Sequence, residues 1–346
     1  MDSEAPAATG SLPLHQQDED QDSLTPEQCT RLADRGPLRP IGTQVAVLLS
    51  THDGAPFLAA QLRSLLAQTH CHWRLYWRDD GSSDSTRRLM AEFTAELGPG
   101  RSVAVGGNGR IGAAQSFLTL LRAAHDDGHA IVAFADQDDV WLPQKLARGV
   151  AALEAVPAGR ATLYCARQLL VDASLRRLAV SFPIRRAPGF PAALTQNVAT
   201  GCTIMLNRAA AALLSASRPP PACMHDWWCY LLIAGAGGRI MADPEPVVLY
   251  RQHDGNLIGA AATRRARAVA ALRRGPGPFM TVFRQNVAAL DQQQDLLTPA
   301  ARESVAGIAH ALRSGPVRRV MALWSRNLVR QSWLETALFW VWFVLG

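Results

Sequence analysis

Three aspartates stand close together at the end of an apolar run in the middle of the chain. The stretch FADQDDVW covers residues 134–141, so Asp136, Asp138 and Asp139 follow directly on the apolar run. Side chains of an extended segment alternate with a period of two, so Asp136 and Asp138 point to the same side. Two such carboxylates suit Mg²⁺ or Mn²⁺, which keeps its remaining positions for water and phosphate oxygens. The pattern predicts a cation that binds a diphosphate; a solvated loop in which Asp139 caps the next helix is the alternative.

Two other acidic loops follow predicted strands nearer the start of the chain. Thr51 and Asp53 come after the strand expected over 44–50, and Asp79 ends the strand expected to begin at Trp73. A carboxylate beside backbone amides suits the imide N–H and carbonyl of a base, although each loop alone also fits a simple turn. Because ligands bind at the carboxyl ends of parallel strands, we expect the three acidic loops to meet at one rim.

Alternating strands and helices would position these loops. The second expected helix begins near Asp84 or Ser85, and two more strands are expected over 102–107 and 129–136. Alternation with short connections predicts a mostly parallel sheet that helices cover on both faces. The second half is less regular. Its expected elements are strands over 162–172 and 201–208, a helix over 225–238, two short strands in RIMAD and PVVLYRQH, and helices from about 261 onwards.

Two histidine-containing segments in the second half add candidate groups. His225 and Asp226 open an apolar helix, where Asp226 is either a capping residue or a general base that takes a proton from an acceptor hydroxyl. His253 follows a strand in YRQHDGN. A lone histidine there is more often structural, and it becomes a metal ligand only if it reaches the cation.

Charge is distributed unevenly along the chain. Residues 1–40 carry eight acidic side chains and three arginines, which predicts a disordered acidic tail. Residues 261–346 carry twelve arginines against four acidic side chains. We therefore expect a tail over 1–40, an α/β domain over 41–260 and an Arg- and Trp-rich helical region over 261–346. The cysteines form no CxxC pair and no signal peptide is evident, so a cytoplasmic protein with reduced thiols is expected.

The chain finishes on a basic and then purely apolar segment. Residues 318–346 join arginines to tryptophans, and residues 336–346 are nearly free of polar groups. A bilayer span takes roughly 20 apolar residues, so this segment is too short to cross. Association with the inner face of the cell membrane is the preferred interpretation, and a helix packed on the core or across a dimer is the alternative.

The ordered series of motifs resembles the family 2 glycosyltransferases, which have the GT-A fold. The similar stretches run from about Val45 to Gly259 and include RDDGSSDST, NGRIG, DQDDVW, QNVATG, HDWW and YRQH. DQDDVW, HDWW and YRQH look most like the bacterial rhamnosyltransferase-type branch that builds surface polysaccharide. One departure is His52-Asp53, where the first motif of the family usually has Tyr-Asn.

The resemblance implies a role for each matching residue. Thr51, Asp53 and Asp79 would surround the base and ribose, and Arg110 would lie near the nucleotide. Asp136 would contact the ribose or a metal-bound water. Asp138 would bind the divalent metal on the diphosphate, with His253 helping, and Asp226 would be the catalytic base.

These roles describe an inverting transfer in one displacement. Asp226 would deprotonate an acceptor hydroxyl that attacks the anomeric carbon opposite the diphosphate. The expected partners are a dTDP- or UDP-sugar, a glycan or lipid-linked acceptor, and the membrane surface. Rhamnose is the candidate donor sugar. Two other classes stay open: a sugar-phosphate nucleotidyltransferase, which the single lysine (Lys145) disfavours, and an Arg-rich nucleic-acid scaffold, which leaves the acidic loops unexplained. No nucleic acid is expected.

Overall fold

The computed structural model describes residues 42–107, 109–221, 223–253 and 275–346. The tail predicted to be disordered, 1–40, lies outside these residues, and so does the predicted domain boundary at 260. The fold described below is that of the second compact unit of the chain, which begins at Pro40.

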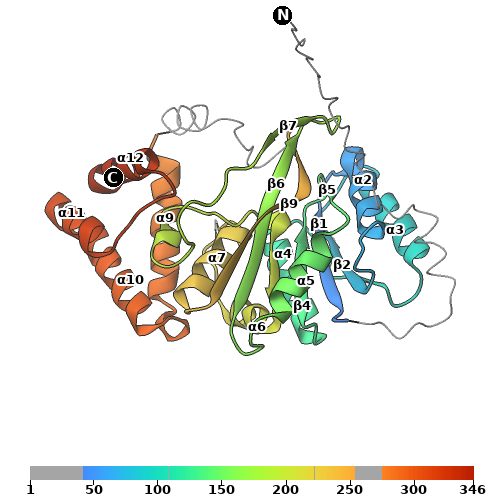
Figure 1. Ribbon diagram of the computed structural model, residues 1–346, viewed down its shortest axis with the longest axis horizontal. Helices are drawn as coiled ribbons and strands as arrows, with labels where there is room; N and C mark the ends of the chain where they lie inside the picture. The colour runs from blue at the N-terminus through green and yellow to red at the C-terminus, as the bar shows by residue number, and fades with distance from the viewer. Residues whose placement is uncertain (1–41, 108, 222, 254–274) are drawn as a thin grey trace, which may run out of the picture. The chain divides into compact units, whose positions relative to one another are not determined.

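Within the described residues, nine strands form one mixed sheet with the order β3-β2-β1-β4-β8-β6-β9-β5, and β7 pairs with β6 (Figure 1). The first four strands pair in parallel, so their carboxyl ends reach the same edge. The strands are β1 (Val45–Thr51), β2 (Trp73–Asp79), β3 (Ser102–Ala104), β4 (Ile131–Ala135), β5 (Val140–Trp141), β6 (Thr162–Val171), β7 (Arg177–Val180), β8 (Met205–Asn207) and β9 (Arg239–Arg251).

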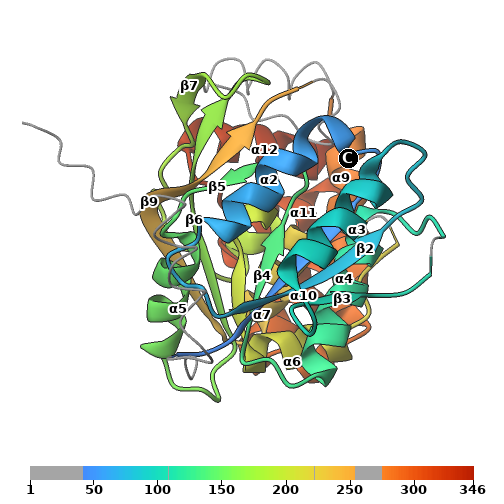
Figure 2. The ribbon, with the colours of Figure 1, turned by 90° about the vertical axis from the view of Figure 1, so that its right-hand side faces the viewer.

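Helices cover both faces of this sheet, as Figures 1 and 2 show from two directions. They are α2 (Ala55–Leu66), α3 (Thr86–Leu97), α4 (Ala113–Asp126), α5 (Lys145–Glu154), α6 (Arg208–Ala216), α7 (His225–Gly235), α9 (Gly277–Asp291), α10 (Pro299–Leu312), α11 (Pro316–Ser325) and α12 (Trp333–Leu345). Side-chain caps start several of them: Asn207 accepts from Ala210 N, and Thr298 accepts from Ala301 N. The predicted α/β architecture with a C-terminal helical region is confirmed.

Strand β1 shows why its sequence is continuously apolar. Val45, Val47 and Leu49 pack into the core with α2, α3 and α5. Ala46 and Leu48 belong to the core on the opposite face, with α4, α6 and α7. Successive side chains point to opposite faces, so a strand with both faces covered needs an apolar residue at every position.

Two predicted strands were wrong in their extent, and the alternative in which Asp139 caps a helix is excluded. Residues 201–208 are a 3₁₀ turn (Gly201–Thr203) followed by the short β8, because Thr203 N and Ile204 N bond back three residues. RIMAD and PVVLYRQH form one strand, β9, whose register against β6 shifts where its prolines fall. Asp139 caps no helix; its carboxylate accepts from Arg251 N, and α5 begins only at Lys145.

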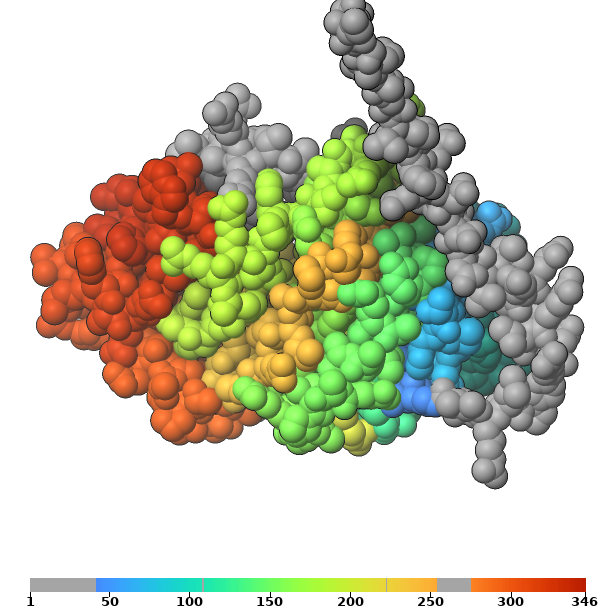
Figure 3. Space-filling model, in the orientation of Figure 1, coloured from blue at the N-terminus to red at the C-terminus, as the bar shows by residue number. Residues whose placement is uncertain are grey.

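The C-terminal helices pack one apolar side against the core. Phe339 and Phe343 of α12 are fully buried and contact Phe283 of α9 at ring-centroid distances of 5.6 and 5.7 Å. Thr195 Oγ1 donates to Val329 O at 2.6 Å, which joins the 181–198 segment to the linker before α12. Figure 3 shows the yellow-green surface of that segment beside the red C-terminal helices. In the described residues, no helix is long and apolar enough to cross a membrane.

Candidate active site

The ends of β1 and β2 lie side by side and join two of the predicted acidic loops. Thr51 is the register partner of Asp79, and its hydroxyl donates to Asp79 Oδ1 at 3.3 Å. On the same edge Asp53, with φ of 45°, accepts from Ser83 N at 2.7 Å. This bond from the Ser83 backbone is the main reason why the pKa of Asp53 is lowered. The two loops are therefore joined at the carboxyl edge of the sheet, and we call their hydrogen-bonded residues (Thr51, Asp53, Asp79, Ser82 and Ser83) the Asp79 ledge.

Asp79 is the centre of this ledge. Its carboxylate accepts from Ser82 N at 3.0 Å and from Arg87 Nε at 2.6 Å, in addition to Thr51 and the Ser82 hydroxyl. Burial raises the pKa of this carboxyl, but the bonds from Ser82 and Arg87 outweigh it, so the net pKa is lowered. A carboxylate offers about four lone-pair positions. A base N–H could bind Asp79 only if Arg87 or Ser82 released an oxygen.

Gln137 connects the first loop to the DQDD loop, a link that sequence reasoning missed. Its Oε1 accepts from His52 N at 2.8 Å, and its Nε2 donates to His52 O at 2.9 Å. The amide packs directly on Gly54, where an added Cβ would lie 2.2 Å from Oε1. Gly54 is therefore required by the close approach of Gln137, and no feature of the sequence near either residue signals this pairing.

The predicted cation ligands come together. His253 Nε2 lies 2.9 Å from Asp138 Oδ2, and Asp138 retains an exposed fraction of 21%. Arg251, at the end of β9, donates from Nε to Asp138 O at 2.8 Å and so fixes the backbone of the loop. Asp136 lies two residues away. Burial, together with the charges of Asp138 and Asp226, raises the pKa of Asp136 to about 7.

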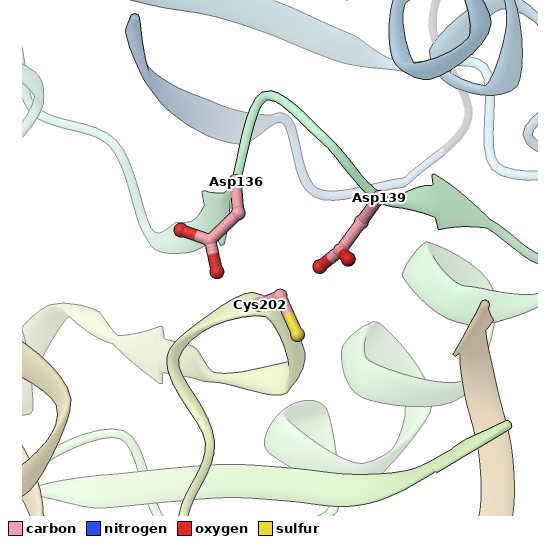
Figure 4. A group of neighbouring side chains, drawn as sticks. All are labelled: Asp136, Asp139 and Cys202. Atoms are coloured by element: carbon pink, nitrogen blue, oxygen red, sulfur yellow. The ribbon is translucent and has the colours of Figure 1, made fainter. Parts of the chain in front are cut away.

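A second acidic group lies deeper. One ligand atom from each of Asp136, Asp139 and Cys202 falls within 4.8 Å of the others, and Figure 4 shows the two carboxylates directed toward the Cys202 side. Asp139 is fully buried and accepts from Arg251 N at 3.1 Å. Burial raises the pKa of both Asp139 and the Cys202 thiol well above their usual values. A neutral, enclosed set with a thiol does not suit an ion that must keep water and phosphate ligands.

The half-buried set of Asp136, Asp138 and His253 fits a hard divalent ion better. Oxygen and imidazole ligands are present, and the set is open enough for an ion that keeps water and phosphate ligands. Lys145 is the basic residue whose charge acts on Asp136. Its side chain is completely buried against the Trp141 ring, and burial lowers its pKa well below the usual value. These residues could hold Mg²⁺ or Mn²⁺.

Asp226 lies in the first turn of α7 and faces this acidic group. Its Oδ2 accepts from Asn197 Nδ2 at 2.9 Å and from Gly201 N at 3.3 Å. Gly201 precedes Cys202 of the deeper group, and the charge of Asp226 is one of the causes of the raised pKa of Asp136. Burial raises the pKa of Asp226 to about 6, while bonds from Trp227, Gly201 and Asn197 act in the opposite direction. A carboxyl with such a pKa can exchange a proton near neutral pH.

The neighbours of Asp226 on α7 are core residues. Trp228 is fully buried, and its Nε1 donates to Ser217 Oγ at 3.0 Å. His225 stacks on Phe117 at 4.1 Å between ring centroids, and burial lowers its pKa to about 3. Both side chains therefore serve the packing of the core.

Arg110 is the predicted site residue least fixed by the structure. Its side chain is exposed, in the loop before α4. The next two backbone N–H groups, of Ile111 and Gly112, donate to Asp80 at 2.7 and 2.8 Å. Arg110 thus lies on a loop that is tied to Asp80, the residue after Asp79.

Comparison with known proteins supplies the family. Residues 46–209 match the model of glycosyl transferase family 2, a segment that contains β1 to β8 and the three acidic loops. This match identifies a family 2 glycosyltransferase segment within the chain. This glycosyltransferase is 23% identical to the dTDP-rhamnosyl transferase RfbG of Shigella flexneri, over 63% of this chain and 76% of that protein. The family predicted from the sequence motifs is confirmed.

Two further likenesses are informative about this family 2 glycosyltransferase. It is 31% identical to the UDP-Glc:alpha-D-GlcNAc-diphosphoundecaprenol beta-1,3-glucosyltransferase WfgD of Escherichia coli, over 30% of this chain and 38% of that protein. Its fold resembles S. aureus TarS residues 1–349 in complex with UDP-GlcNAc, with a TM-score of 0.55 at 14% identity over 78% of this chain and 72% of that one. The GT-A type of fold is thereby confirmed.

Proposed function

We propose that this glycosyltransferase moves a sugar from a pyrimidine-nucleotide donor to a hydroxyl of a growing bacterial glycan, with inversion at the anomeric carbon. The observation that carries the proposal is the position of Asp226: a buried carboxylate with a pKa of about 6 within charge-interaction range of Asp136, at the edge where the acidic loops converge. A single base opposite the diphosphate suffices for one displacement.

Each residue would have a defined task. Thr51, Asp53 and the Asp79 ledge would receive the base and ribose, and Arg110 would approach the phosphates. Asn197 and the Gly201 N–H bind Asp226 Oδ2, and the Trp227 N–H binds Oδ1, which leaves Oδ1 a further lone pair for the acceptor proton. Asp138 and His253, with Asp136, would hold Mg²⁺ or Mn²⁺, which when bound would supply positive charge for the leaving diphosphate.

The relatives support a pyrimidine nucleotide. One is named for a dTDP-sugar and another for a UDP-sugar, and thymine and uracil share the same imide edge. Rhamnose is the donor sugar named for the first, glucose for the second. We propose a dTDP- or UDP-sugar, with dTDP-rhamnose as the first candidate, because the match to that relative covers the larger part of the chain.

A lipid-linked acceptor at the inner membrane surface completes the proposal. Among the described residues, most of the exposed large hydrophobic side chains lie on α11 and α12: Val317, Val320, Met321, Trp324, Trp333, Leu334, Val341 and Leu345. Those of α11 recur at i, i+3, i+4 and i+7, which is a helical stripe. Arg313 and Arg318 are exposed beside it. An apolar stripe flanked by arginines suits an anionic lipid surface.

The test is a screen of the purified full-length protein against dTDP- and UDP-sugars, with Mn²⁺ and with EDTA. We expect one donor to raise the melting temperature and to be slowly hydrolysed, in both cases only with the metal. Hydrolysis of no donor, or equal hydrolysis in EDTA, would contradict the proposal.

A further inference from the structure

A cavity of about 240 Å³ lies between the segment 186–198 and the linker 327–331 that joins α11 to α12. Arg186, Phe190 and Gln196 line one side, Tyr230 of α7 lines the floor, and Arg330 lines the other side. The cavity is separate from the strand edge that would receive the nucleotide, and nothing in the transfer chemistry described above uses it.

The walls of the cavity are held in place by hydrogen bonds. Gln331 Oε1 accepts from Arg186 N at 2.9 Å, and Gln331 Nε2 donates to Arg186 O at 3.1 Å. The backbone N–H of Gln331 donates to Gln196 Oε1 at 3.0 Å. One glutamine thus fastens the linker to both ends of the opposite wall, so the cavity is formed before any ligand arrives.

Its charge is one-sided. Arg186 and Arg330 both contribute to the lining, and none of the described residues that line it is acidic. The Arg330 guanidinium lies 5.3 Å above the Phe279 ring, and Phe279 in turn stacks on Trp227, so this cation is positioned by the core. A lining with two arginines and no carboxylate among its described residues favours an anion, and the planar N–H forks of guanidinium groups match phosphate oxygens.

The cavity adjoins the proposed base. Tyr230, which lines it, is one helical turn after Asp226 on α7. Gln196 and Val198 also line it, and they flank Asn197, whose amide donates to Asp226. The linker wall leads directly into α11 and α12, which carry the exposed apolar stripe. The lining thus joins the segment that holds Asp226 to the linker between the two helices of the exposed apolar stripe.

We propose that this cavity binds the phosphate or diphosphate of a lipid-linked acceptor. The lipid chain would extend from the cavity toward α11 and α12, and the sugar hydroxyl of the acceptor would lie near Asp226. The inference rests on the proposed function for the identity of the acceptor. Its chemical core, binding of a diphosphate by Arg186 and Arg330, stands on the cavity alone.

The test uses the full-length protein in EDTA, with inorganic pyrophosphate and farnesyl diphosphate as probes in calorimetric titrations. Arg186→Gln and Arg330→Gln should each weaken both probes on the order of tenfold or more, since each removes charge-assisted hydrogen bonds. Arg239→Gln, an exposed arginine at the start of β9, is the matched control and should bind as wild type. Farnesyl diphosphate should bind more tightly than pyrophosphate; equal affinity would contradict the lipid-linked source.

Two results would overturn the site itself. One is wild-type affinity in both glutamine variants; the other is loss of metal-free binding in Asp138→Asn, which would place the anion in the donor site. Because Arg330 packs on Phe279, Arg330→Lys and Arg186→Lys serve as folded charge-retaining variants that should recover part of the affinity. Donor hydrolysis by the wild-type protein, measured in parallel, tests the proposed function separately. If no donor is hydrolysed but pyrophosphate binding depends on the two arginines, the proposed function is contradicted and the anion site in the cavity is supported.

Discussion

Asn197 and Asp226 are 29 residues apart in the chain, yet the side-chain amide of Asn197 lies 2.9 Å from Asp226 Oδ2. The bond comes from the segment before the 3₁₀ turn and fixes the carboxylate on α7. Asn197 is thus a positioning residue, and its contribution is measurable through the titration of Asp226.

The first prediction concerns pH. A base must be deprotonated to act, so kcat should fall below about pH 6 in proportion to the deprotonated fraction of Asp226, whose pKa burial raises to about 6. In Asn197→Ala the acidic limb of the pH–rate profile should move to higher pH, because the lost hydrogen bond favoured the charged form of Asp226. A pH–rate profile of both proteins checks this. A limb that does not move in Asn197→Ala would remove the positioning role.

The second prediction concerns the cation. Asp138→Asn and His253→Ala should each raise the Mn²⁺ concentration needed for half-maximal donor hydrolysis by roughly tenfold or more, since each removes a ligand. Asp291→Asn, on α9, is the control and should leave the metal titration unchanged. If Cys202→Ala had the larger effect, the deeper group with Asp139 would be the metal site instead.

The third prediction concerns the Gln137 link. Gly54→Ala places a Cβ against Gln137 Oε1, and the amide can withdraw only by giving up both bonds to His52. We expect a loss of about 1–3 kcal/mol of the free energy of unfolding, with weaker donor binding. Gly159→Ala meets nothing within 4 Å and should be neutral or slightly stabilising. Denaturant titrations of the two variants should therefore differ; equal midpoints would contradict the packing argument.

The fourth prediction concerns the lipid surface. Met321 and Trp324 are 64% and 75% exposed on α11, so replacing both by Glu should spare folding. The double variant should lose most of its co-sedimentation with vesicles that contain anionic lipid. Leu178→Glu, which alters an exposed leucine of β7, should co-sediment as wild type. Unchanged binding by the α11 variant would show that this stripe does not contact the membrane.

The strand-edge part of the site could be predicted from sequence because it follows local rules. Apolar runs that end in Thr51, Asp79 and Asp136 mark strands, and parallel strands bring their carboxyl ends together. The pairing of His253 with Asp138 required the family resemblance, because 115 positions separate the two residues.

Other contacts have no local signal. Asn197 with Asp226, Gln137 with Gly54, and Arg186 with Arg330 become neighbours only when distant segments fold together. The prolines of β9 hid a single long strand, since Pro244 and Pro246 suggested a break where the structure has a register shift. Local propensity was overruled there by pairing with β6.

The most direct test of the account compares donor binding with transfer in Asp226→Asn. The variant keeps the shape of the side chain and removes the base, so the donor dissociation constant should stay within about threefold of wild type while sugar transfer falls by roughly a thousandfold or more. Transfer that persists in Asp226→Asn would contradict the assignment of Asp226 as the base, and loss of donor binding together with transfer would show that the residue is structural.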